Sequence, residues 1–360
     1  MNRALLAVTL GGLKTAGKIR DGLGGGHLFT LEKYCSGQEH GLQPITGKLR
    51  DFMGEMFEKY REIILVMSTG IAVRSIAPYV QSKLTDPAVV VLDEQGRFVI
   101  SLLSGHIGGA NALAEQVAKI TGGQAVITTA SDCLGLESVD MLAQRNHLIM
   151  ESVEQVKKVT ACLVNRKRVV LVNETNLRLQ EDASESNMNS WEEISLKEAL
   201  VLFKKANPPE AMIYVGYREE PGVNGLSIPV AKLRPKSLIL GVGCKKNTAP
   251  ERLRAAVARF FQQINITPLS LKAIATVDVK KDEPAILSLA EEMSLPLVIV
   301  GREEILSIEN NFTCSDFVKK TIGVGCVAEP AAFIASRGGS KIAPKTAFQG
   351  ITFALYEEKN

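Results

Sequence analysis

Short apolar runs alternate with longer amphipathic stretches along most of this chain of 360 residues. The runs have the length and branched side chains of buried strands, whereas the stretches repeat apolar residues at helical spacing. Strands that alternate with helices are typical of a parallel sheet covered by helices. We therefore predict an α/β fold, with two α/β domains whose sheets are mostly parallel at the N- and C-terminal ends, joined by a small α/β middle region.

The same pattern divides the chain into three parts. A chain of this length exceeds the size at which a single hydrophobic core keeps growing, so several domains are expected. We predict an N-terminal α/β domain over residues 1–140, a middle domain or spacer over 141–235, and a C-terminal α/β domain over 236–360. The middle part contains a polar, acidic stretch at 181–190 that is typical of a surface loop. It contains no evident cluster of reactive side chains.

Three predicted strands of the N-terminal part, at residues 63–67, 88–92 and 98–103, each end in a turn rich in Gly, Ser, Thr, Asp or His. Ligands of open α/β sheets bind outside the carboxyl ends of such strands. We therefore expect these turns to form a binding site. Residues 93–96 have the composition of a hairpin turn, so part of the sheet is expected to be antiparallel. A first strand is expected at residues 5–10.

Composition and charge exclude several classes of protein. The content of 46% hydrophobic and 22% charged residues is that of an ordinary globular protein, and the net charge of +3 is too small to indicate nucleic-acid binding. Six cysteines without a C-x-x-C pair indicate reduced thiols, and four histidines without metal-ligand spacing make a zinc site unexpected. No apolar stretch approaches the roughly 20 residues that span a bilayer. We expect a cytoplasmic protein.

Two glycine-rich segments have the spacing of nucleotide-binding motifs, but each lacks a residue that the chemistry needs. Residues 12–19 fit the P-loop spacing, yet Ile19 stands where a hydroxyl must hold Mg²⁺. Residues 323–328 fit a dinucleotide motif, yet no acidic residue follows about 20 positions later. We interpret the first segment as a strand–helix turn. A nucleotide-dependent enzyme is thus the weakest functional alternative.

The turn at residues 104–111 contains His106 and three glycines and opens a predicted helix. A histidine titrates near neutral pH, so His106 could act as a general base, or it could simply start the helix with a hydrogen bond to the backbone. Other polar residues gather at neighbouring strand ends, and these are Asn111, Thr128, Thr129, Ser131 and Asp132. Arg74, Lys83 and Asp86 could bind a ligand or form surface ion pairs, and the sequence leaves both alternatives open.

A second glycine-rich turn, at residues 241–248, follows the first predicted strand of the C-terminal domain and includes Lys245 and Lys246. Glycines let a ligand approach backbone N–H groups, and the start of a helix favours anions. The turn therefore either binds a carboxylate or phosphate or is a solvated surface turn. Thr248 and Glu251 have the spacing of a capping box, which predicts a helix over residues 249–263.

Specific segments at both ends of the chain resemble one known family. They are GIAVRSIAP, KLTDPAVVVLDEQGRFVISLLSGHIGGAN and ITTASD in the N-terminal part, and GVGCKKNT, residues 278–283 and residues 325–332 in the C-terminal part. These segments resemble the cobalt-precorrin 5A hydrolases, the CbiG family. The middle region matches that family only in position and size, and the first 45 residues match it loosely.

The resemblance implies an enzyme of anaerobic vitamin B12 synthesis. Such an enzyme opens the δ-lactone on the ring A acetate of a methylated cobalt-corrinoid and releases acetaldehyde, which gives cobalt-precorrin 5B. The cobalt would belong to the substrate, so no resident cofactor or metal is expected. The expected partner is the cobalt-corrinoid substrate, with neighbouring pathway enzymes as further candidates and with no nucleic acid or membrane. A non-catalytic corrinoid carrier is the alternative from another class.

For this chemistry, His106 is the leading candidate for the base that activates water, followed by Asp132 and Glu329. Gly108, Gly109 and Asn111 are expected to supply oxyanion donors. Lysine, arginine and backbone N–H groups suit the many carboxylates of the substrate. The residues expected to contact the substrate are Arg74, Lys83, Asp86, Ser104, Gly105, Gly108, Gly109, Asn111, Thr128 and Thr129 in the N-terminal domain, and Gly241, Gly243, Cys244, Lys245, Lys246, Thr248, Asp278, Lys280 and Glu283 in the C-terminal domain.

Overall fold

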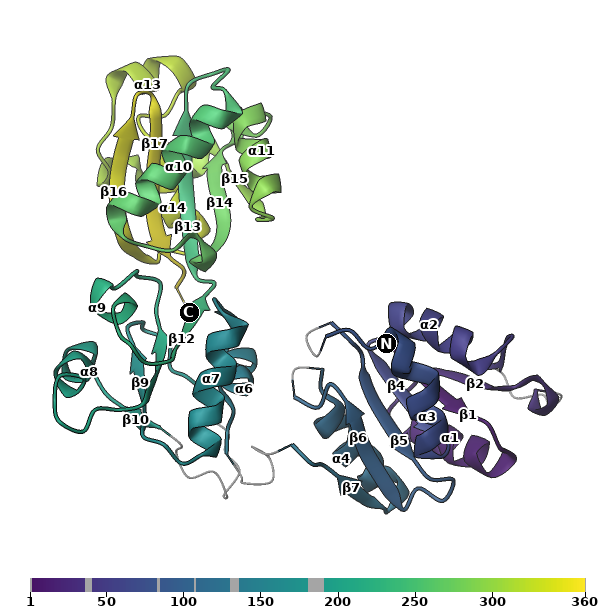
Figure 1. Ribbon diagram of the computed structural model, residues 1–360. Coiled ribbons are helices and arrows are strands. Elements are labelled where there is room, and N and C mark those ends of the chain that lie inside the picture. The colour runs from purple at the N-terminus through teal and green to yellow at the C-terminus, as the bar shows by residue number, and fades with distance from the viewer. Residues whose placement is uncertain are drawn as a thin grey trace. The chain divides into compact units, whose positions relative to one another are not determined.

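The computed structural model describes residues 2–35, 41–82, 85–106, 108–129, 136–180 and 191–359. The chain forms three sheets in two compact units, and the described residues of these units lie within 2–144 for the first and within 145–180 and 191–359 for the second (Figure 1). Helices cover sheets whose strands are mostly parallel, so the predicted α/β fold class is confirmed.

Within the described ranges, no helix combines the length and the apolar character needed to cross a membrane.

The N-terminal sheet has seven strands in the order β3-β2-β1-β4-β5-β6-β7. All neighbours pair parallel except β5 and β6, which are antiparallel, so the hairpin expected at residues 93–96 is confirmed. Because of this reversal, β6 and β7 end at the edge of the sheet where β1 to β5 begin. The elements are β1 (Arg3–Ala7), α1 (Leu10–Gly22), β2 (His27–Leu31), β3 (Leu42–Ile45), α2 (Leu49–Lys59), β4 (Glu62–Val66), α3 (Thr69–Ile76), β5 (Ala88–Leu92), β6 (Phe98–Leu103), α4 (Ala110–Thr121) and β7 (Gln124–Val126).

Alternate residues of the N-terminal strands supply two hydrophobic cores, one on each face of the sheet. Leu5 and Ala7 of β1 pack in the core that includes α1 and α4, whereas Ala4 and Leu6 pack in the core that includes α2 and α3. Strands buried on both faces are continuous apolar runs, which explains why the sequence pattern identified β4 and β5 so clearly.

The start of α1 lies against a carboxylate of the hairpin turn. Thr9 donates its hydroxyl to Oε2 of Glu94 at 2.9 Å, and Thr15 donates to the Glu94 carbonyl at 2.7 Å. A Cβ at Gly11 would lie 1.7 Å from Oε1 of Glu94, so the glycine makes room for this carboxylate. The segment 12–19 is thus part of a helix and not a strand–helix turn, and the first strand ends at Ala7 and not at residue 10.

The middle sheet has the order β10-β9-β11-β12-β8, and only the pairing of β12 with β8 is antiparallel. One face packs on α8 and α9, and α7 contacts the strands as well. The elements, with the short helix that precedes them, are α6 (Val139–Arg145), β8 (Leu148–Met150), α7 (Val153–Val164), β9 (Val169–Asn173), β10 (Glu192–Glu193), α8 (Leu196–Leu202), β11 (Ala211–Val215), α9 (Pro221–Asn224) and β12 (Val230–Pro235).

The C-terminal sheet has the order β15-β14-β13-β17-β16, with β13, β14 and β15 parallel and β17 antiparallel to both of its neighbours. Helices α10 and α11 pack in the core on one face, and α12 and α14 pack in the core on the other. The elements are β13 (Leu238–Cys244), α10 (Pro250–Ile264), β14 (Leu271–Val277), α11 (Pro284–Glu292), β15 (Leu297–Val300), α12 (Arg302–Ile308), α13 (Asp316–Ile322), α14 (Ala328–Ala335), β16 (Ser340–Phe348) and β17 (Ile351–Glu357).

The predicted capping box of α10 is absent, although the helix itself is present. Its N-cap is Ala249, with Pro250 in the first turn, and no side chain caps it. Thr248 donates its hydroxyl to the carbonyl of Lys245 at 2.7 Å and lies one residue before the N-cap. Proline at the first helical position needs no N–H partner, which lowers the demand for a cap.

Candidate active site

The three strand ends that were expected to form one site lie at two edges of the N-terminal sheet. β4 and β5 end at one edge, whereas β6 ends at the opposite edge because it pairs antiparallel with β5. The expectation of a single site is therefore wrong. Arg74 is an exposed residue of α3, the helix that follows β4, and does not belong to the turn after β6.

The turn after β6 is held in a tight conformation. Ser104 has a φ of 58° and Gly109 a φ of 90°, both in the left-handed region. A Cβ at Gly108 would lie 2.3 Å from that of Ser104, so only glycine fits there. The hydroxyl of Ser104 donates to the carbonyl of Asp86 at 3.1 Å, which ties the turn to the loop before β5.

The loop before β5 is shaped by the carboxylate of Asp86. Its Oδ2 accepts the backbone N–H groups of Gln81 at 2.9 Å and Ser82 at 3.1 Å. Asp86 therefore supports the wall of the site next to Ser104. Lys83, another predicted contact in this loop, lies outside the described residues.

The amide of Asn111, in the first turn of α4, connects the ends of β6 and β7. Its Oδ1 accepts the hydroxyl of Ser101 at 2.6 Å, and its Nδ2 donates to Oγ1 of Thr129 at 3.3 Å. A Cβ at Gly105 would lie 2.6 Å from Oδ1 of Asn111, so this glycine lets the turn pack on the amide. The exposed Thr128 precedes Thr129 at the same edge. The structure thus brings together the predicted residues that follow β6 and β7.

His106 lies in this turn next to a buried carboxylate. Its Nδ1 is 3.9 Å from Oδ2 of Asp140, and the two side chains are 14% and 5% exposed. A carboxylate near one ring nitrogen orients the imidazole and stabilises its protonated form, which suits a histidine that accepts a proton at the other nitrogen. The arrangement can therefore support general base chemistry. Asp132, the second candidate base, lies outside the described residues.

The sequence interpretation missed Asp140, which lies in α6. Its neighbours Val139, Leu142 and Ala143 are buried, and so is Asp140 itself. An acidic residue flanked by apolar residues at helical spacing is one that the fold buries, and buried acids are paired or functional. That spacing was the available signal.

The C-terminal domain brings two of its predicted motifs to one edge. β13 and β14 are parallel neighbours, so their carboxyl ends, at Cys244 and Val277, open on the same side. Lys245, Lys246 and Thr248 follow the first strand, and Asp278 and Lys280 follow the second. Lys245 and Lys246 are exposed, Thr248 is half-buried, and Lys280 is buried.

A buried ion pair follows β14, near Cys244 at the end of β13. Nζ of Lys280 is 3.0 Å from Oε2 of Glu283, and the side chains are 11% and 6% exposed. Burial raises the pKa of the nearby Cys244 thiol, against the opposing charge of Lys280. Oε1 of Glu283 is buried and, among the described residues, accepts no hydrogen bond. A ligand or water that donates to this oxygen would complete the site.

Asp278 and the two glycines of the strand serve the domain itself. Asp278 pairs with Arg302, Nε to Oδ1 at 3.0 Å, at the ends of β14 and β15. A Cβ at Gly241 would lie 1.8 Å from the carbonyl oxygen of Ala328, and one at Gly243 would lie 2.6 Å from Oγ1 of Thr352. These glycines make room for α14 and β17, whereas the sequence analysis expected them to make room for a ligand.

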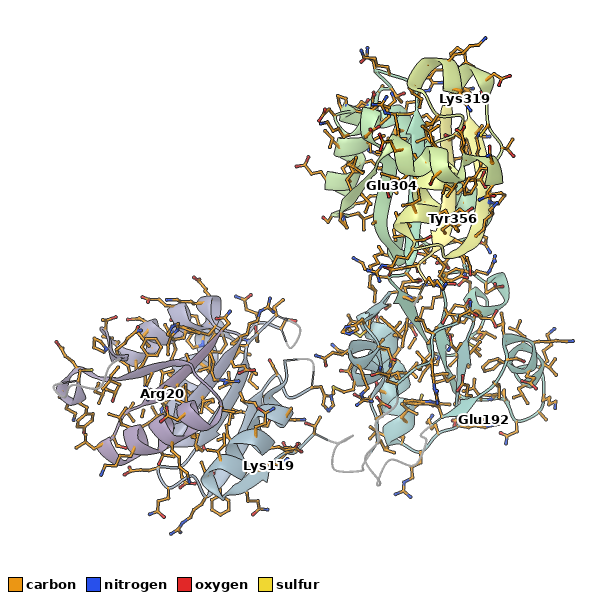
Figure 2. The ribbon with its side chains drawn as sticks, turned by 180° about the vertical axis from the view of Figure 1, so that it is seen from behind. Arg20, Lys119, Glu192, Glu304, Lys319 and Tyr356 are labelled. Carbon is orange, nitrogen blue, oxygen red and sulfur yellow. The ribbon has the colours of Figure 1, made fainter. Side chains whose placement is uncertain are left out.

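Glu329 lies away from the edge of the C-terminal sheet where β13 and β14 end. Its Oε1 is 2.9 Å from Nζ of Lys341, which interacts with the hydroxyl of Tyr356, labelled in Figure 2. Tyr356 pairs with Ile239, five residues before Cys244 on β13, which is roughly 17 Å along a strand. Glu329 thus joins α14 to the β16–β17 hairpin and is not near Lys280.

Three protein-family models match successive parts of the chain. They are the cobalamin synthesis G N-terminal domain at residues 51–132, the cobalamin biosynthesis central region at 137–225, and the cobalamin synthesis G C-terminus at 238–356. Together with the α/β fold, they define a cobalamin-synthesis protein of three regions.

Two curated relatives match almost the whole chain. The cobalt-precorrin-5A hydrolase of Salmonella typhimurium is 37% identical over 330 residues, 91% of this chain and 90% of the relative. That of Priestia megaterium is 33% identical over 343 residues, 92% and 88% of the two chains. The chain therefore belongs to the CbiG family of cobalt-precorrin-5A hydrolases.

A solved structure of a cobalamin biosynthesis protein G homologue from Sulfolobus solfataricus also matches, with 20% identity and a TM-score of 0.40 over 99% of this chain and 97% of that chain.

Proposed function

We propose that this chain is a cobalt-precorrin-5A hydrolase, which opens the ring A acetate δ-lactone of its corrinoid substrate and releases acetaldehyde. Membership of the family supports the activity. The observation that supports the site is the imidazole of His106 beside the buried carboxylate of Asp140, in a glycine-rich turn at a strand end.

In the first step, water adds to the lactone carbonyl. His106 takes the proton from this water at Nε2, while Asp140 faces Nδ1 and stabilises the imidazolium that forms. Negative charge develops on the carbonyl oxygen, and the backbone N–H of Gly108 acts as a donor to it. The N–H of Gly109, which the sequence also predicted as a donor, instead donates to the carbonyl of His106 at 2.9 Å. Collapse of the adduct breaks the bond between the acyl carbon and the ring oxygen, which leaves a carboxylate and an alcohol.

In the second step, the alcohol becomes the carbonyl of acetaldehyde. Its O–H proton leaves, the carbon–carbon bond to the macrocycle breaks, and the electron pair passes into the macrocycle, which is protonated later. The imidazolium of His106 is a suitable carrier for these protons. The cobalt arrives with the substrate, so the proposal requires no resident cofactor.

The lysines of the C-terminal domain suit the carboxylates of such a substrate. Lys245 and Lys246 are exposed after β13, and Lys280 is buried in its pair with Glu283. Ammonium groups bind carboxylates through charge-assisted hydrogen bonds. We assign this edge of the C-terminal domain to the binding of carboxylates.

The proposal is tested by acetaldehyde release. The purified full-length chain is incubated with the lactone substrate, and acetaldehyde is measured through NADH consumption by added alcohol dehydrogenase. We expect one acetaldehyde for each corrinoid converted. Binding of the corrinoid without any acetaldehyde would reject the hydrolase and favour a carrier.

Asp140 can be tested as a positioning residue. We expect Asp140→Asn to lower kcat by about 10- to 100-fold with KM unchanged, since the amide keeps the shape but not the charge. This loss is smaller than the roughly 10⁴-fold loss in a Ser-His-Asp triad, because a separation of 3.9 Å is longer than a hydrogen bond. An unaltered kcat would remove Asp140 from the mechanism. So would a fall in kcat that is explained by partial unfolding of the variant, seen as a lower midpoint of thermal unfolding.

A further inference from the structure

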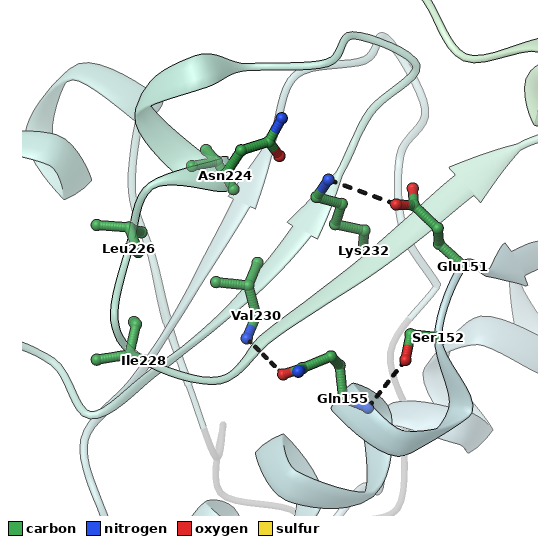
Figure 3. Close-up of a pocket in the computed structure, with 9 residues that line it drawn as sticks. Glu151, Ser152, Gln155, Asn224, Leu226, Ile228, Val230 and Lys232 are labelled. Atoms are coloured by element: carbon green, nitrogen blue, oxygen red, sulfur yellow. Dashed lines mark hydrogen bonds and ion pairs between the residues drawn. The ribbon is translucent and has the colours of Figure 1, made fainter.

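A separate cavity of about 370 Å³ lies in the middle domain, between the start of α7, the segment after α9 and the strand β12 (Figure 3). This volume is within the range of small-ligand sites. Nine residues line it, and these are Glu151, Ser152, Gln155, Val223, Asn224, Leu226, Ile228, Val230 and Lys232. None of them was a candidate in the sequence analysis.

One wall of the cavity is aliphatic. Val223 is buried, and Leu226, Ile228 and Val230 are half-buried, packed against the core of the middle sheet. Together they present methyl groups to the cavity and offer no polar atom from their side chains. This wall favours a hydrocarbon chain or methyl groups of a ligand.

The other end of the cavity carries hydrogen-bond donors that the protein does not use up. Nζ of Lys232 is 3.4 Å from Oε1 of Glu151 and 3.2 Å from Oε2 of Glu219, which accounts for two of its three N–H groups. The hydroxyl oxygen of Ser152, on the α7 side of the cavity next to Gln155, accepts the N–H of Gln155 at 3.3 Å (Figure 3). In the described part of the chain, the exposed side-chain amide of Asn224 makes no hydrogen bond.

The charge around these donors is balanced. The two carboxylates that hold Lys232 also bind the fully buried Arg234, Glu151 at 2.6 Å and Glu219 at 2.7 Å. Two cations thus face two anions, so the cluster carries no net negative charge that would repel an anionic ligand. An ammonium N–H and an amide N–H₂ in an aliphatic cavity suit a carboxylate with a short hydrocarbon chain.

We propose that this cavity, between α7, α9 and β12, binds an aliphatic carboxylate through Lys232 and Asn224. The carboxylate is either a free short-chain acid or a side chain of the corrinoid substrate, which carries acetates and propionates on a methylated ring. Only the second source rests on the proposed function.

The test uses the full-length chain with ¹³C-labelled Ile, Leu and Val methyl groups, since Leu226, Ile228 and Val230 then report on the cavity by NMR. Butyrate is titrated first, and cobyrinic acid, a cobalt-corrin with free carboxylates, is titrated second. We expect the methyl signals of these residues to shift with a dissociation constant in the millimolar range for butyrate, as its few atoms allow. If the signals shift with butyrate alone, the site is assigned to free acids. If the corrin shifts them with a lower dissociation constant than butyrate, the site is assigned to the substrate.

Asn224→Asp places a negative charge at the polar end without changing the size of the side chain. We expect this variant to bind whichever probe shifts the methyl signals at least about tenfold more weakly, because its new carboxylate repels the carboxylate of the probe. Asn207→Asp is the matched control, an exposed asparagine of the same domain outside the cavity, and it should bind as the unmodified chain does. The proposal is overturned if neither probe shifts these methyl signals, or if Asn224→Asp binds equally well. Acetaldehyde release by the unmodified chain is unaffected by either result, so the two proposals fail separately.

Discussion

Replacement of His106 by glutamine is expected to lower kcat for acetaldehyde release by roughly 10²- to 10⁴-fold, the usual contribution of a general base. Glutamine keeps a polar side chain in the turn but cannot take a proton from water at neutral pH. His106 is mostly covered, and its neighbour Asp140 is buried. The carboxylate therefore stabilises the imidazolium that forms when His106 takes a proton from water. The rate is measured with saturating lactone substrate, and a thermal unfolding scan shows whether the fold is retained.

His27→Gln provides the control in the same unit. His27 begins β2, and its Nδ1 is 2.7 Å from the hydroxyl of Tyr60, away from the turn after β6. We expect kcat of this variant within about twofold of the unmodified chain, because exposed substitutions away from a site have small effects. A rate for His106→Gln that equals that of His27→Gln would assign the chemistry to other residues.

Arg234→Met is expected to lower the free energy of unfolding by about 3–5 kcal/mol, the cost of removing one partner from a buried ion pair. Arg234 is fully buried, and its guanidinium binds both Glu151 and Glu219. It also donates to the carbonyls of Gly216 and Arg218, each at 2.9 Å. Methionine fills a similar volume but removes all the hydrogen bonds that the guanidinium donates to these carbonyls and carboxylates. Urea unfolding followed by circular dichroism measures the loss.

An exposed ion pair of the same domain is the control. Arg168 pairs with Glu192 at 2.8 Å, but the two side chains are 42% and 51% exposed, and Glu192 is labelled in Figure 2. We expect Arg168→Met to cost about 1 kcal/mol or less, since water replaces the lost contact. Equal losses for the two variants would mean that the network around Arg234 does not stabilise the middle domain.

Strands and helices were predictable from the sequence where the chain is buried on both faces of a sheet. β5, in which every residue is buried, begins and ends where the apolar run does, at 88–92. Strand direction was the harder property. The hairpin before Phe98 was predicted from its turn residues, but its consequence, that β6 ends at the opposite edge from β4, depends on how the strands pair.

The candidate site was predictable in its local parts and not in its long-range contacts. The turn with His106 was evident from its glycines, yet Asp140 belongs to a separate helix that follows the sheet. Gly241 was interpreted as a place for a ligand because the chain that covers it, at Ala328, is far along the sequence. The cavity beside Lys232 escaped notice because its lining residues come from separated segments of ordinary composition.

The central claim is that the site at His106 activates water for attack on the lactone carbonyl. Conversion of the substrate in H₂¹⁸O, followed by mass spectrometry of the corrinoid product, tests this directly. We predict that the product gains one ¹⁸O in its ring A acetate, a mass increase of about two, because acyl–oxygen cleavage by water places the label in the carboxylate. A product without the label would show that the ring opens by cleavage of the alkyl carbon–oxygen bond, and it would contradict the role assigned to His106.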